Sequence, residues 1–350
     1  MDIGNKIKQL RYKAGLTQEQ LAAKLGISAQ SVSKWETAVT MPDITLLPLL
    51  ASELGVTIDD LFDLTTDQRL KRIEKRIDLE EEFPSDVFKE YELFLKNQLE
   101  ENEDKTKILS LLAHLYHHRI EADARRVSKL AREAIMRNPE QKKCQWLLQK
   151  AEGAHIWDWN VANHTEVIDF YKKVIENDAQ EPKTPMPYYE VMDNLIADHR
   201  TKEAEKYLEI YKTLPAHKPF LIPVYKASIA LAEYDVAKAD GIMESAMKDF
   251  SDNSGFLFET AQYYARKCEY EKAIGYYERS WATDEKPRFT DTLHAIAIIY
   301  EILGNYAQAV KTYDRMINCI KEEWGYNDGD AAVVEVERTK RRLQDMQASK

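Results

Sequence analysis

The sequence predicts an all-α protein in which a bundle of five short helices precedes a longer array of paired helices. Apolar residues recur with helical rather than strand-like spacing along almost the whole chain. Capping and glycine signals divide the first 62 residues into short helices, and a pattern of five residues returns 36 positions later near the C-terminus. We therefore expect three parts, over residues 1–66, 67–83 and 84–350.

The composition favours a folded protein of the cytoplasm. Hydrophobic residues make up 44% of the chain and charged residues 31%, which is typical of globular domains rather than disordered ones. No run approaches the roughly 18 apolar residues that span a bilayer, and the first residues lack the apolar segment of a signal peptide. Cys144, Cys268 and Cys319 are scattered and odd in number, so we expect free thiols in a reducing compartment.

Charge is distributed unevenly along the chain. Residues 1–40 carry a net charge of +3 and the other 310 residues carry −14, within a total of −11. A basic N-terminal part is compatible with DNA, because electrostatic attraction and repulsion are screened beyond about 8–10 Å. The acidic remainder predicts only modest affinity for DNA of arbitrary sequence.

The first two helices follow from apolar spacing and capping residues. An apolar stripe marks the first helix: Ile3, Ile7 and Leu10. Gly15 ends this helix, and Thr17 with Gln20 forms a capping box that begins the second helix, Gln18 to Leu25. Gly26 supplies the left-handed residue that ends the second helix.

Three further helices complete the predicted bundle. Ser28 caps the third helix, which runs through Val32, Trp35 and Glu36. The fourth helix has an apolar stripe that ends at Gly55: Ile44, Leu47, Leu50, Ala51 and Leu54. The fifth is a short helix after Thr57 with three apolar residues: Ile58, Leu61 and Phe62. Two helices joined by a glycine turn within such a bundle predict a helix-turn-helix fold.

This part resembles the Xre-type family of helix-turn-helix regulators, whose fold is that of the lambda-like phage repressors. The resemblance runs from Ile7 to Phe62. It is carried by these residues: Arg11, Leu16–Ala22, Leu25–Ser28, Val32–Glu36, Pro42 and Leu54–Val56. The loop from Thr37 to Met41 departs from the family, whose members often carry glycine and basic residues there. The resemblance therefore does not extend to a phosphate contact by this loop.

The resemblance implies that the helix beginning near Ser28 enters the major groove of DNA. Gln30 has the chemistry to contact adenine through N6 and N7, and Lys34 to reach guanine O6 or N7. Ala29 would pack on a thymine methyl group, whereas Gln18 and Ser28 stand at helix N-termini that favour phosphate. The residues expected at DNA are Gln18, Ser28, Ala29, Gln30, Ser31, Ser33 and Lys34. The alternative for Gln30 and Lys34 is an ordinary solvated surface.

Two further assignments concern architecture rather than DNA. Arg11 and Glu36 match a structural ion pair of the family. Trp35 is expected in the core rather than at DNA, because large aromatic side chains are mostly buried.

A charged segment follows the bundle. Residues 67–83 predict a connecting helix with an exposed apolar stripe of Leu70, Ile73 and Ile77, and Pro84 marks its end. We expect a two-fold dimer, as in the lambda-like relatives, because a single short reading helix has a small footprint on DNA. The connector stripe or the repeats would supply the contact between the two chains.

The C-terminal part contains an internal repeat. Five residues recur at an offset of 36: Ala261, Tyr264, Tyr270, Ala273 and Tyr277 match Ala297, Tyr300, Tyr306, Ala309 and Tyr313. This pattern resembles the tetratricopeptide repeat, in which Gly304 occupies the turn between the two helices and Cys268 replaces it in the earlier copy. Weaker copies are expected around Val127, in residues 150–179, and around Ala204 and Ala237, with a capping helix from Ala331 to Met346.

Stacked helix pairs form a superhelix whose inner surface comes from the first helix of each pair. The resemblance places twelve side chains there: Tyr116, Arg119, Trp159, Asn160, Tyr189, Asp193, Lys226, Phe258, Gln262, Arg266, His294 and Glu301. Aromatic, charged and hydrogen-bonding groups in one groove suit an extended peptide or protein segment. The alternative is that most of them are ordinary helix-surface residues.

Signals for catalysis are weak. The sequence has no P-loop, no dinucleotide-binding fingerprint and no nucleophile elbow, so we expect neither an enzyme nor a cofactor. His114, His117 and His118 have a spacing that places two imidazoles on one helical face, as in some metal sites. No carboxylate lies in the register that a metalloprotease helix has, and a packed or solvated helix is the favoured interpretation.

The combination of both parts resembles the RRNPP-type quorum sensors, peptide-responsive regulators of Gram-positive bacteria. That resemblance implies a transcription factor whose repeat domain binds an effector peptide or protein and mediates dimerisation. The alternative is an interaction scaffold that holds a protein partner and binds DNA only secondarily. A regulated enzyme is a third and weaker hypothesis.

Overall fold

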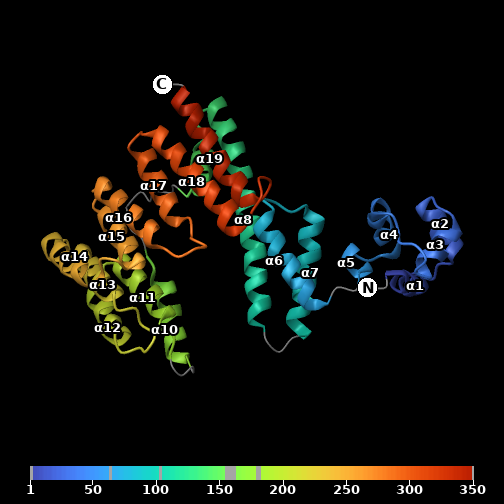
Figure 1. The fold of residues 1–350 in the computed structure, drawn as a ribbon, viewed down its shortest axis with the longest axis horizontal. Helices are drawn as coiled ribbons and strands as arrows, with labels where there is room; N and C mark the ends of the chain where they lie inside the picture. The colour runs from blue at the N-terminus through green and yellow to red at the C-terminus, as the bar shows by residue number, and fades with distance from the viewer. Residues whose placement is uncertain (1–2, 63–64, 102–104, 154–162, 179–182, 349–350) are drawn as a thin grey trace. The chain divides into compact units, whose positions relative to one another are not determined.

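The computed structural model describes residues 3–62, 65–101, 105–153, 163–178 and 183–348. Every regular element within these ranges is a helix, which confirms the predicted all-α fold (Figure 1). The chain divides into two compact units, Met1–Ala122 and Asp123–Lys350. None of the described helices is both long and apolar enough to cross a bilayer.

The helices of the first unit are α1 (Ile3–Lys13), α2 (Gln18–Leu25), α3 (Ala29–Glu36), the 3-10 turn η1 (Ile44–Leu46), α4 (Leu47–Leu54), α5 (Ile58–Leu61), α6 (Thr66–Leu79) and α7 (Ser85–Glu101). Helix α8 (Thr106–Arg137) crosses the division between the units. The helices of the second unit are α9 (Lys142–Ala151), α10 (Thr165–Asn177), α11 (Met186–Ala197), α12 (Thr201–Tyr211), α13 (Leu221–Ala232), α14 (Val236–Phe250), α15 (Ser254–Arg266), α16 (Tyr270–Thr283), α17 (Asp291–Ile302), α18 (Tyr306–Trp324) and α19 (Ala331–Ala348).

The first five helices enclose one apolar core, as predicted. Its central side chains are almost inaccessible to solvent: Ile7, Leu21, Val32, Leu50 and Leu61. The predicted capping box is present, since Thr17 accepts from the backbone of Gln20 and the Gln20 side chain accepts from the backbone of Thr17. Gly26 adopts the left-handed conformation (φ 68°), and Ser28 caps α3 by accepting from the backbone N–H of Ser31 at 3.2 Å. These caps fix the turn that joins α2 to α3.

Helix α6 is packed rather than exposed, which corrects one prediction. Leu70 and Ile73 are 6% and 0% exposed, and Ile77 is partly buried against the same cluster. Side chains of α7 and α8 cover this stripe: Phe88, Tyr91, Leu95, Leu111 and Leu115. The predicted exposed dimer contact on α6 is therefore wrong. The compact units divide within α8, so the boundaries expected after residues 66 and 83 remain predictions.

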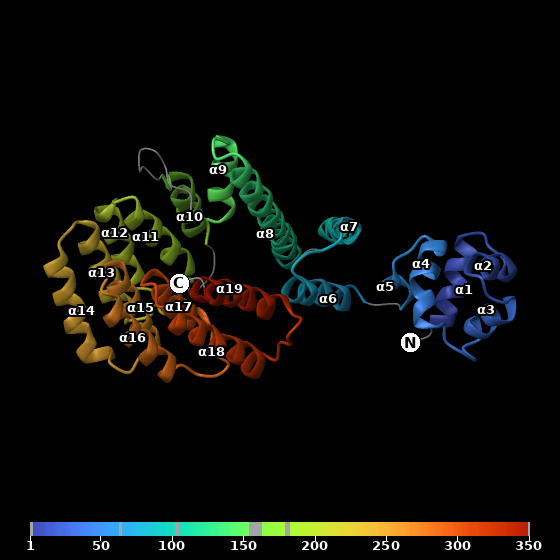
Figure 2. The same cartoon turned by 90° about the horizontal axis from the view of Figure 1, so that it is seen from above.

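Four helix hairpins of the described second unit share one turn (Figures 1 and 2). The turn residue has a positive φ in each case: 56° at His199, 63° at Tyr234, 58° at Cys268 and 69° at Gly304. Each time the following residue donates its N–H to a carbonyl five positions earlier, as Asn305 does to Tyr300 at 2.8 Å. The predicted turns at Cys268 and Gly304 are confirmed, and the two preceding hairpins have the same turn, at His199 and Tyr234.

The hairpins pack through small residues at a fixed place. Four alanines on the second helices are 0% exposed: Ala204, Ala239, Ala273 and Ala309. A methyl side chain lets two helix backbones approach closely, which explains why an alanine recurs at this place in each hairpin. The copy predicted around Ala237 is misplaced by two residues, because Ala237 is exposed and Ala239 is buried. The copy predicted around Val127 is also wrong, since Val127 lies inside the continuous helix α8.

The last helix caps the array, as predicted. Figure 2 shows α17, α18 and α19 side by side, and α19 packs along α18. Val333, Val336 and Leu343 of α19 are buried against Ile317 and Ile320 of α18. The apolar face of the final hairpin is thereby covered.

Candidate functional sites: the recognition helix and the groove of the repeats

Helix α3 presents a polar face to solvent. Gln30 and Lys34, one turn apart, are exposed, and Ser33 is partly exposed between them. Val32 and Trp35 hold the opposite face in the core at 0% and 5% exposure. The expected placement of Trp35 in the core is therefore confirmed. This orientation exposes Gln30 and Lys34, the two side chains that can hydrogen-bond to base edges.

The other predicted DNA contacts are partly occupied within the bundle. The Gln18 side chain donates to the Glu36 carboxylate at 2.9 Å. The Ser28 and Ser31 hydroxyl groups lie 2.9 Å apart, where they cap α3. Ala29 is half-buried and packs on the core. Gln30 and Lys34 are thus the exposed members of the predicted set that lie on α3 itself.

A buried ion pair fixes α3 on α1, as predicted. The Arg11 guanidinium donates to both oxygens of Glu36, with Nε–Oε1 at 2.6 Å and Nη2–Oε2 at 2.8 Å. A third donor of Arg11 bonds the carbonyl of Leu16 at 2.8 Å. Burial raises the pKa of a carboxylate, but the hydrogen bonds from Arg11 and Gln18 outweigh it and hold the pKa of Glu36 below its ordinary value.

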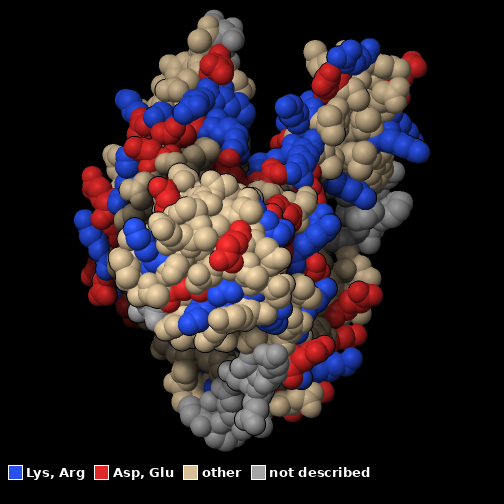
Figure 3. Space-filling view, turned by 90° about the vertical axis from the view of Figure 1, so that its right-hand side faces the viewer, with Lys and Arg blue, Asp and Glu red and all other residues tan. Residues whose placement is uncertain are grey.

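Charges of both signs are interspersed on the face of the molecule in Figure 3. Lysine and arginine side chains alternate there with aspartate, glutamate and uncharged residues. A mixed surface of this kind gives weaker long-range attraction to a polyanion than a continuous basic face.

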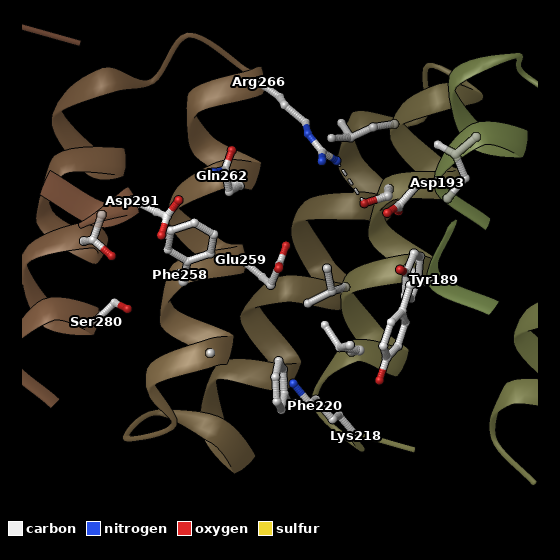
Figure 4. A pocket seen from close by; sticks show the side chains of 18 of the residues that line it. Tyr189, Asp193, Lys218, Phe220, Phe258, Glu259, Gln262, Arg266, Ser280 and Asp291 are labelled. Carbon is white, nitrogen blue, oxygen red and sulfur yellow. Dashed lines mark hydrogen bonds between the residues drawn. The ribbon is translucent and has the colours of Figure 1, made fainter. Parts of the chain in front are cut away.

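The second unit contains a groove of about 1390 Å³ between the first helices of its hairpins. Its walls come from α11, α13 and α15, with the start of α17 and two connecting loops at one end. In Figure 4, Tyr189 and Asp193 face Phe258, Glu259 and Gln262 across this space. Five predicted groove residues line it: Tyr189, Asp193, Phe258, Gln262 and Arg266.

Two carboxylates face the groove interior. Removal from bulk water raises the pKa of Asp193. The hydrogen bond from Tyr225 and the charge of Arg266 lower this pKa, but by less. Much of the Asp193 side chain is nevertheless open to the groove. The same loss of water raises the pKa of Glu259, against the charges of Arg266 and Lys218, and Asp193 adds to the increase. A cationic group of a ligand would favour the ionised form of both carboxylates and lower their pKa again.

Cations and aromatic rings frame these carboxylates. Arg266 crosses from α15 to donate to the Ser228 hydroxyl on α13 at 3.2 Å (Figure 4). The Tyr211 hydroxyl accepts from the backbone N–H of Lys218 at 2.7 Å and so fixes this lysine at the groove. The Phe220 ring lies against Gly255, where an added Cβ would approach its Cζ to 2.7 Å. A larger residue at position 255 would displace this ring.

Other predicted groove residues lie elsewhere. Tyr116 and Arg119 belong to the first unit, where both rest on the Phe88 ring. Lys226 is exposed outside the groove, Glu301 pairs with Arg342 at 2.6 Å, and His294 lines a separate pocket. Trp159 and Asn160 lie outside the described residues.

Sequence reasoning missed several lining residues. Tyr225 and Ser228 occupy the inward face of α13 that Lys226 was expected to share, and Glu259 adjoins the predicted Phe258. A spacing of three and four residues from Gln262 back to Glu259 and Gly255 was the available signal.

The histidine cluster of α8 is structural in part. His118 is buried, stacks on the Phe83 ring with centroids 4.5 Å apart, and lies 2.6 Å from the carbonyl oxygen of Glu80. His117 lies at the surface near Glu121. Among the described residues no three histidine, cysteine or acidic side chains converge as metal ligands.

Comparison with known proteins places the first unit in a family. Residues 7–61 match the helix-turn-helix family model. The chain is 41% identical over 61 residues to the helix-turn-helix transcriptional activator BcrR of Enterococcus faecalis, a match covering 17% of this chain and 30% of the activator. It is 39% identical over 64 residues to an uncharacterized helix-turn-helix transcriptional regulator of Methanocaldococcus jannaschii, covering 18% of this chain and 97% of that protein.

One solved structure is similar over a greater length. The crystal structure of Bacillus thuringiensis PlcR in complex with the peptide PapR7 and DNA matches 89% of this chain and 98% of its own, at 16% identity and a TM-score of 0.28. A likeness of this degree decides nothing about the ligands of the present chain. The sequence matches are decisive for the N-terminal unit, because nearly the whole length of the second relative is covered. The chain belongs to the helix-turn-helix family of transcriptional regulators.

Proposed function

We propose that the chain is a sequence-specific DNA-binding transcriptional regulator of the cytoplasm whose repeat domain binds an effector peptide. Helix α3 would read the major groove through Gln30 and Lys34. The groove of the second unit would receive the effector. We assign no catalytic role to the chain.

The observation that carries the effector proposal is the size and lining of the groove. Small-molecule sites usually have volumes of about 300–1,000 Å³, whereas this groove measures about 1390 Å³. Its lining comes from four successive first helices and alternates aromatic rings with hydrogen-bonding and charged groups. An extended peptide fits such a surface, because its side chains and its backbone amides need both kinds of partner.

Effector binding would act on DNA through the shape of the repeat array. Each repeat contacts only its neighbours, so a ligand that bridges several repeats changes their relative rotation. The shift in DNA affinity equals the ligand's difference in affinity for the two shapes, typically about 1–3 kcal/mol.

The test starts with the full chain. A preferred duplex is selected from a random DNA library and peptides from a random heptapeptide library, and DNA affinity is measured with and without the selected peptide. The double variant Arg266→Glu, Tyr189→Ala is expected to lose the response and to keep the DNA affinity of the peptide-free protein. Lys226→Glu, an exposed change on α13 outside the groove, is the matched control and is expected to respond normally.

Two results would contradict the proposal. A normal response of the double variant would place the signal elsewhere. Failure of the library to yield any peptide, together with copurification of a stable protein partner, would favour the interaction scaffold instead.

A further inference from the structure

A second pocket lies between the last three helices. It has a volume of about 420 Å³ and is lined by side chains of α17, α18 and α19, which lie side by side in Figure 2. Most of its wall is apolar or aromatic: Tyr313, Met316, Ile320, Trp324 and Val336. Its volume falls within the range of about 300–1,000 Å³ in which proteins bind compact ligands.

This pocket adjoins the groove. Phe289 and Asp291 line both, so the two cavities meet at these two residues. The Phe289 ring is 67% exposed on the loop between α16 and α17 and contacts the Trp324 ring with centroids 5.1 Å apart. An aromatic side chain exposed at the junction of two cavities offers apolar surface to a molecule that crosses it.

The loop that carries Phe289 is held firmly. Arg288 pairs with Glu323 and stacks on the Trp281 ring, 4.0 Å from its centroid. The indole of Trp324 donates to the carbonyl of Arg288 at 2.7 Å. The rim is therefore preorganised, and a ligand pays little entropy to order it.

The charges at the pocket restrict its ligand. The lining includes Asp291 and Glu335 but, among the described residues that form it, no lysine or arginine. A carboxylate entering the pocket would meet like charge and apolar walls without a counter-ion. An uncharged, bulky aliphatic or aromatic side chain loses nothing by entering and gains from burial.

We propose that this pocket is a second subsite for the effector peptide, which takes one bulky apolar side chain while the rest of the peptide lies in the groove. The inference rests on the proposed function and adds a requirement to it. The effector carries a large apolar residue next to the peptide segment that lies in the groove between Tyr189 and Arg266. This residue is not the C-terminal residue of the peptide, because its free carboxylate would then lie in the pocket.

The experiment compares peptide selection by two tryptophan variants of the full chain. Thr339→Trp places an indole in the pocket from α19, and Gln344→Trp places one on the exposed surface of the same helix outside the pocket. Circular dichroism and thermal melting establish that each variant is folded; Ala332→Phe, from the pocket's other edge, replaces Thr339→Trp if that variant does not fold.

Peptides selected from a random heptapeptide library by the unaltered chain and by Gln344→Trp are expected to share one position rich in leucine, phenylalanine or tryptophan. Thr339→Trp is expected to bind those peptides about tenfold or more weakly, equivalent to about 1.4 kcal/mol, and to lose selection at that position only. Selected peptides without this preference, or with one that survives Thr339→Trp, would overturn the subsite and leave the proposed function standing. Selection of no peptide by the unaltered chain would overturn both.

Discussion

At the scale of single residues, α3 has a face that packs on the bundle and a face that is exposed to solvent. Arg11, Glu36 and Gln18 form a closed hydrogen-bonded group that fixes the helix on the bundle. Gln30 and Lys34 lie on the opposite, exposed face. Removing Arg11 or Glu36 would leave the other as an unpaired charge in the core, whereas shortening the exposed side chains leaves the packing intact. DNA preference can therefore be tested without unfolding the domain.

The double variant Gln30→Ala, Lys34→Ala is expected to lose sequence preference while remaining folded. Each lost base contact should cost about 1–3 kcal/mol of binding free energy. Affinity for the selected duplex and for scrambled duplexes measures this by mobility shift. Lys13→Ala is the control, because it removes a positive charge from α1 outside the recognition helix and should weaken all duplexes alike. An unchanged preference in the double variant would mean that α3 does not read the bases.

Glu259 predicts a pH-dependent stability. Loss of bulk water raises its pKa in the folded chain, so the folded state holds this proton more tightly than the unfolded state. The free energy of unfolding therefore falls as pH rises from the ordinary carboxyl range through the raised pKa. Glu259→Gln removes this loss.

Thermal melting from pH 4 to pH 8 checks this expectation. Glu259→Gln should melt at a higher temperature than the unaltered chain at neutral pH, and the difference should shrink towards pH 4. Glu244→Gln, an exposed change on α14, is the matched control. A difference that is equal at all pH values would show that packing, not the charge of Glu259, is responsible.

At the scale of elements, the repeat turns carry unequal strain. His199, Tyr234 and Cys268 adopt the same left-handed conformation as Gly304. A side chain in this conformation costs roughly 1–2 kcal/mol, whereas glycine adopts it freely. After each of the three non-glycine turns a buried alanine anchors the second helix, as Ala239 and Ala273 do, and such packing offsets the cost of the turn.

Cys268→Gly is therefore expected to raise the free energy of unfolding, by up to about 1 kcal/mol. Gly304→Ala should lower it by a similar amount. Urea denaturation of both variants measures the two effects. Gly275→Ala lies within helix α16, where an added Cβ meets no atom within 4 Å, and should raise the free energy of unfolding because alanine favours the helix. The opposite sign at Gly304 would then come from its left-handed conformation. A destabilising Cys268→Gly would mean that the thiol contributes more than the backbone strain costs.

The sequence predicts an element well where capping residues mark its ends and where its apolar and polar faces differ. The bundle was predictable because caps at Thr17 and Ser28 and the glycine at Gly26 mark its boundaries. Helix α13 is apolar on nearly all sides, with Ala227 and Ala230 fully buried, so its periodicity does not distinguish the groove face and Lys226 was placed there in error. The turn at Tyr234 carries no glycine, and tertiary packing alone reveals it.

At the scale of the whole molecule, the site residues come from distant parts of the sequence. Tyr189 and Arg266 meet at one groove only because successive hairpins stack with their first helices together. Local patterns locate helix α3 completely. They locate a groove that spans several repeats only if the inward face of each helix is assigned correctly. If the inward face of one helix is assigned wrongly, as in α13, all the groove residues predicted on that helix are wrong.

Assembly of two chains needs an exposed apolar contact. The covered stripe of α6 cannot join two chains, but α10 presents three apolar residues on one face: Val167, Phe170 and Val174 are 43%, 58% and 37% exposed. Exposed apolar stripes of this kind are typical of protein contacts. We expect a two-fold dimer through α10, in which two copies of α3 would be available to two half-sites of DNA.

Light scattering should give twice the 40.7 kDa mass of one chain, both free and on the selected duplex. Phe170→Glu should shift the protein towards the monomer and reduce affinity for a two-half-site duplex much more than for a single half-site, because only the dimer engages both halves. Ile210→Glu, which places the same charge at an exposed position of α12, is the matched control and should leave the mass unchanged. A dimer that survives Phe170→Glu would place the contact on another face, whereas a monomer in all conditions would mean that one α3 helix is sufficient for the site.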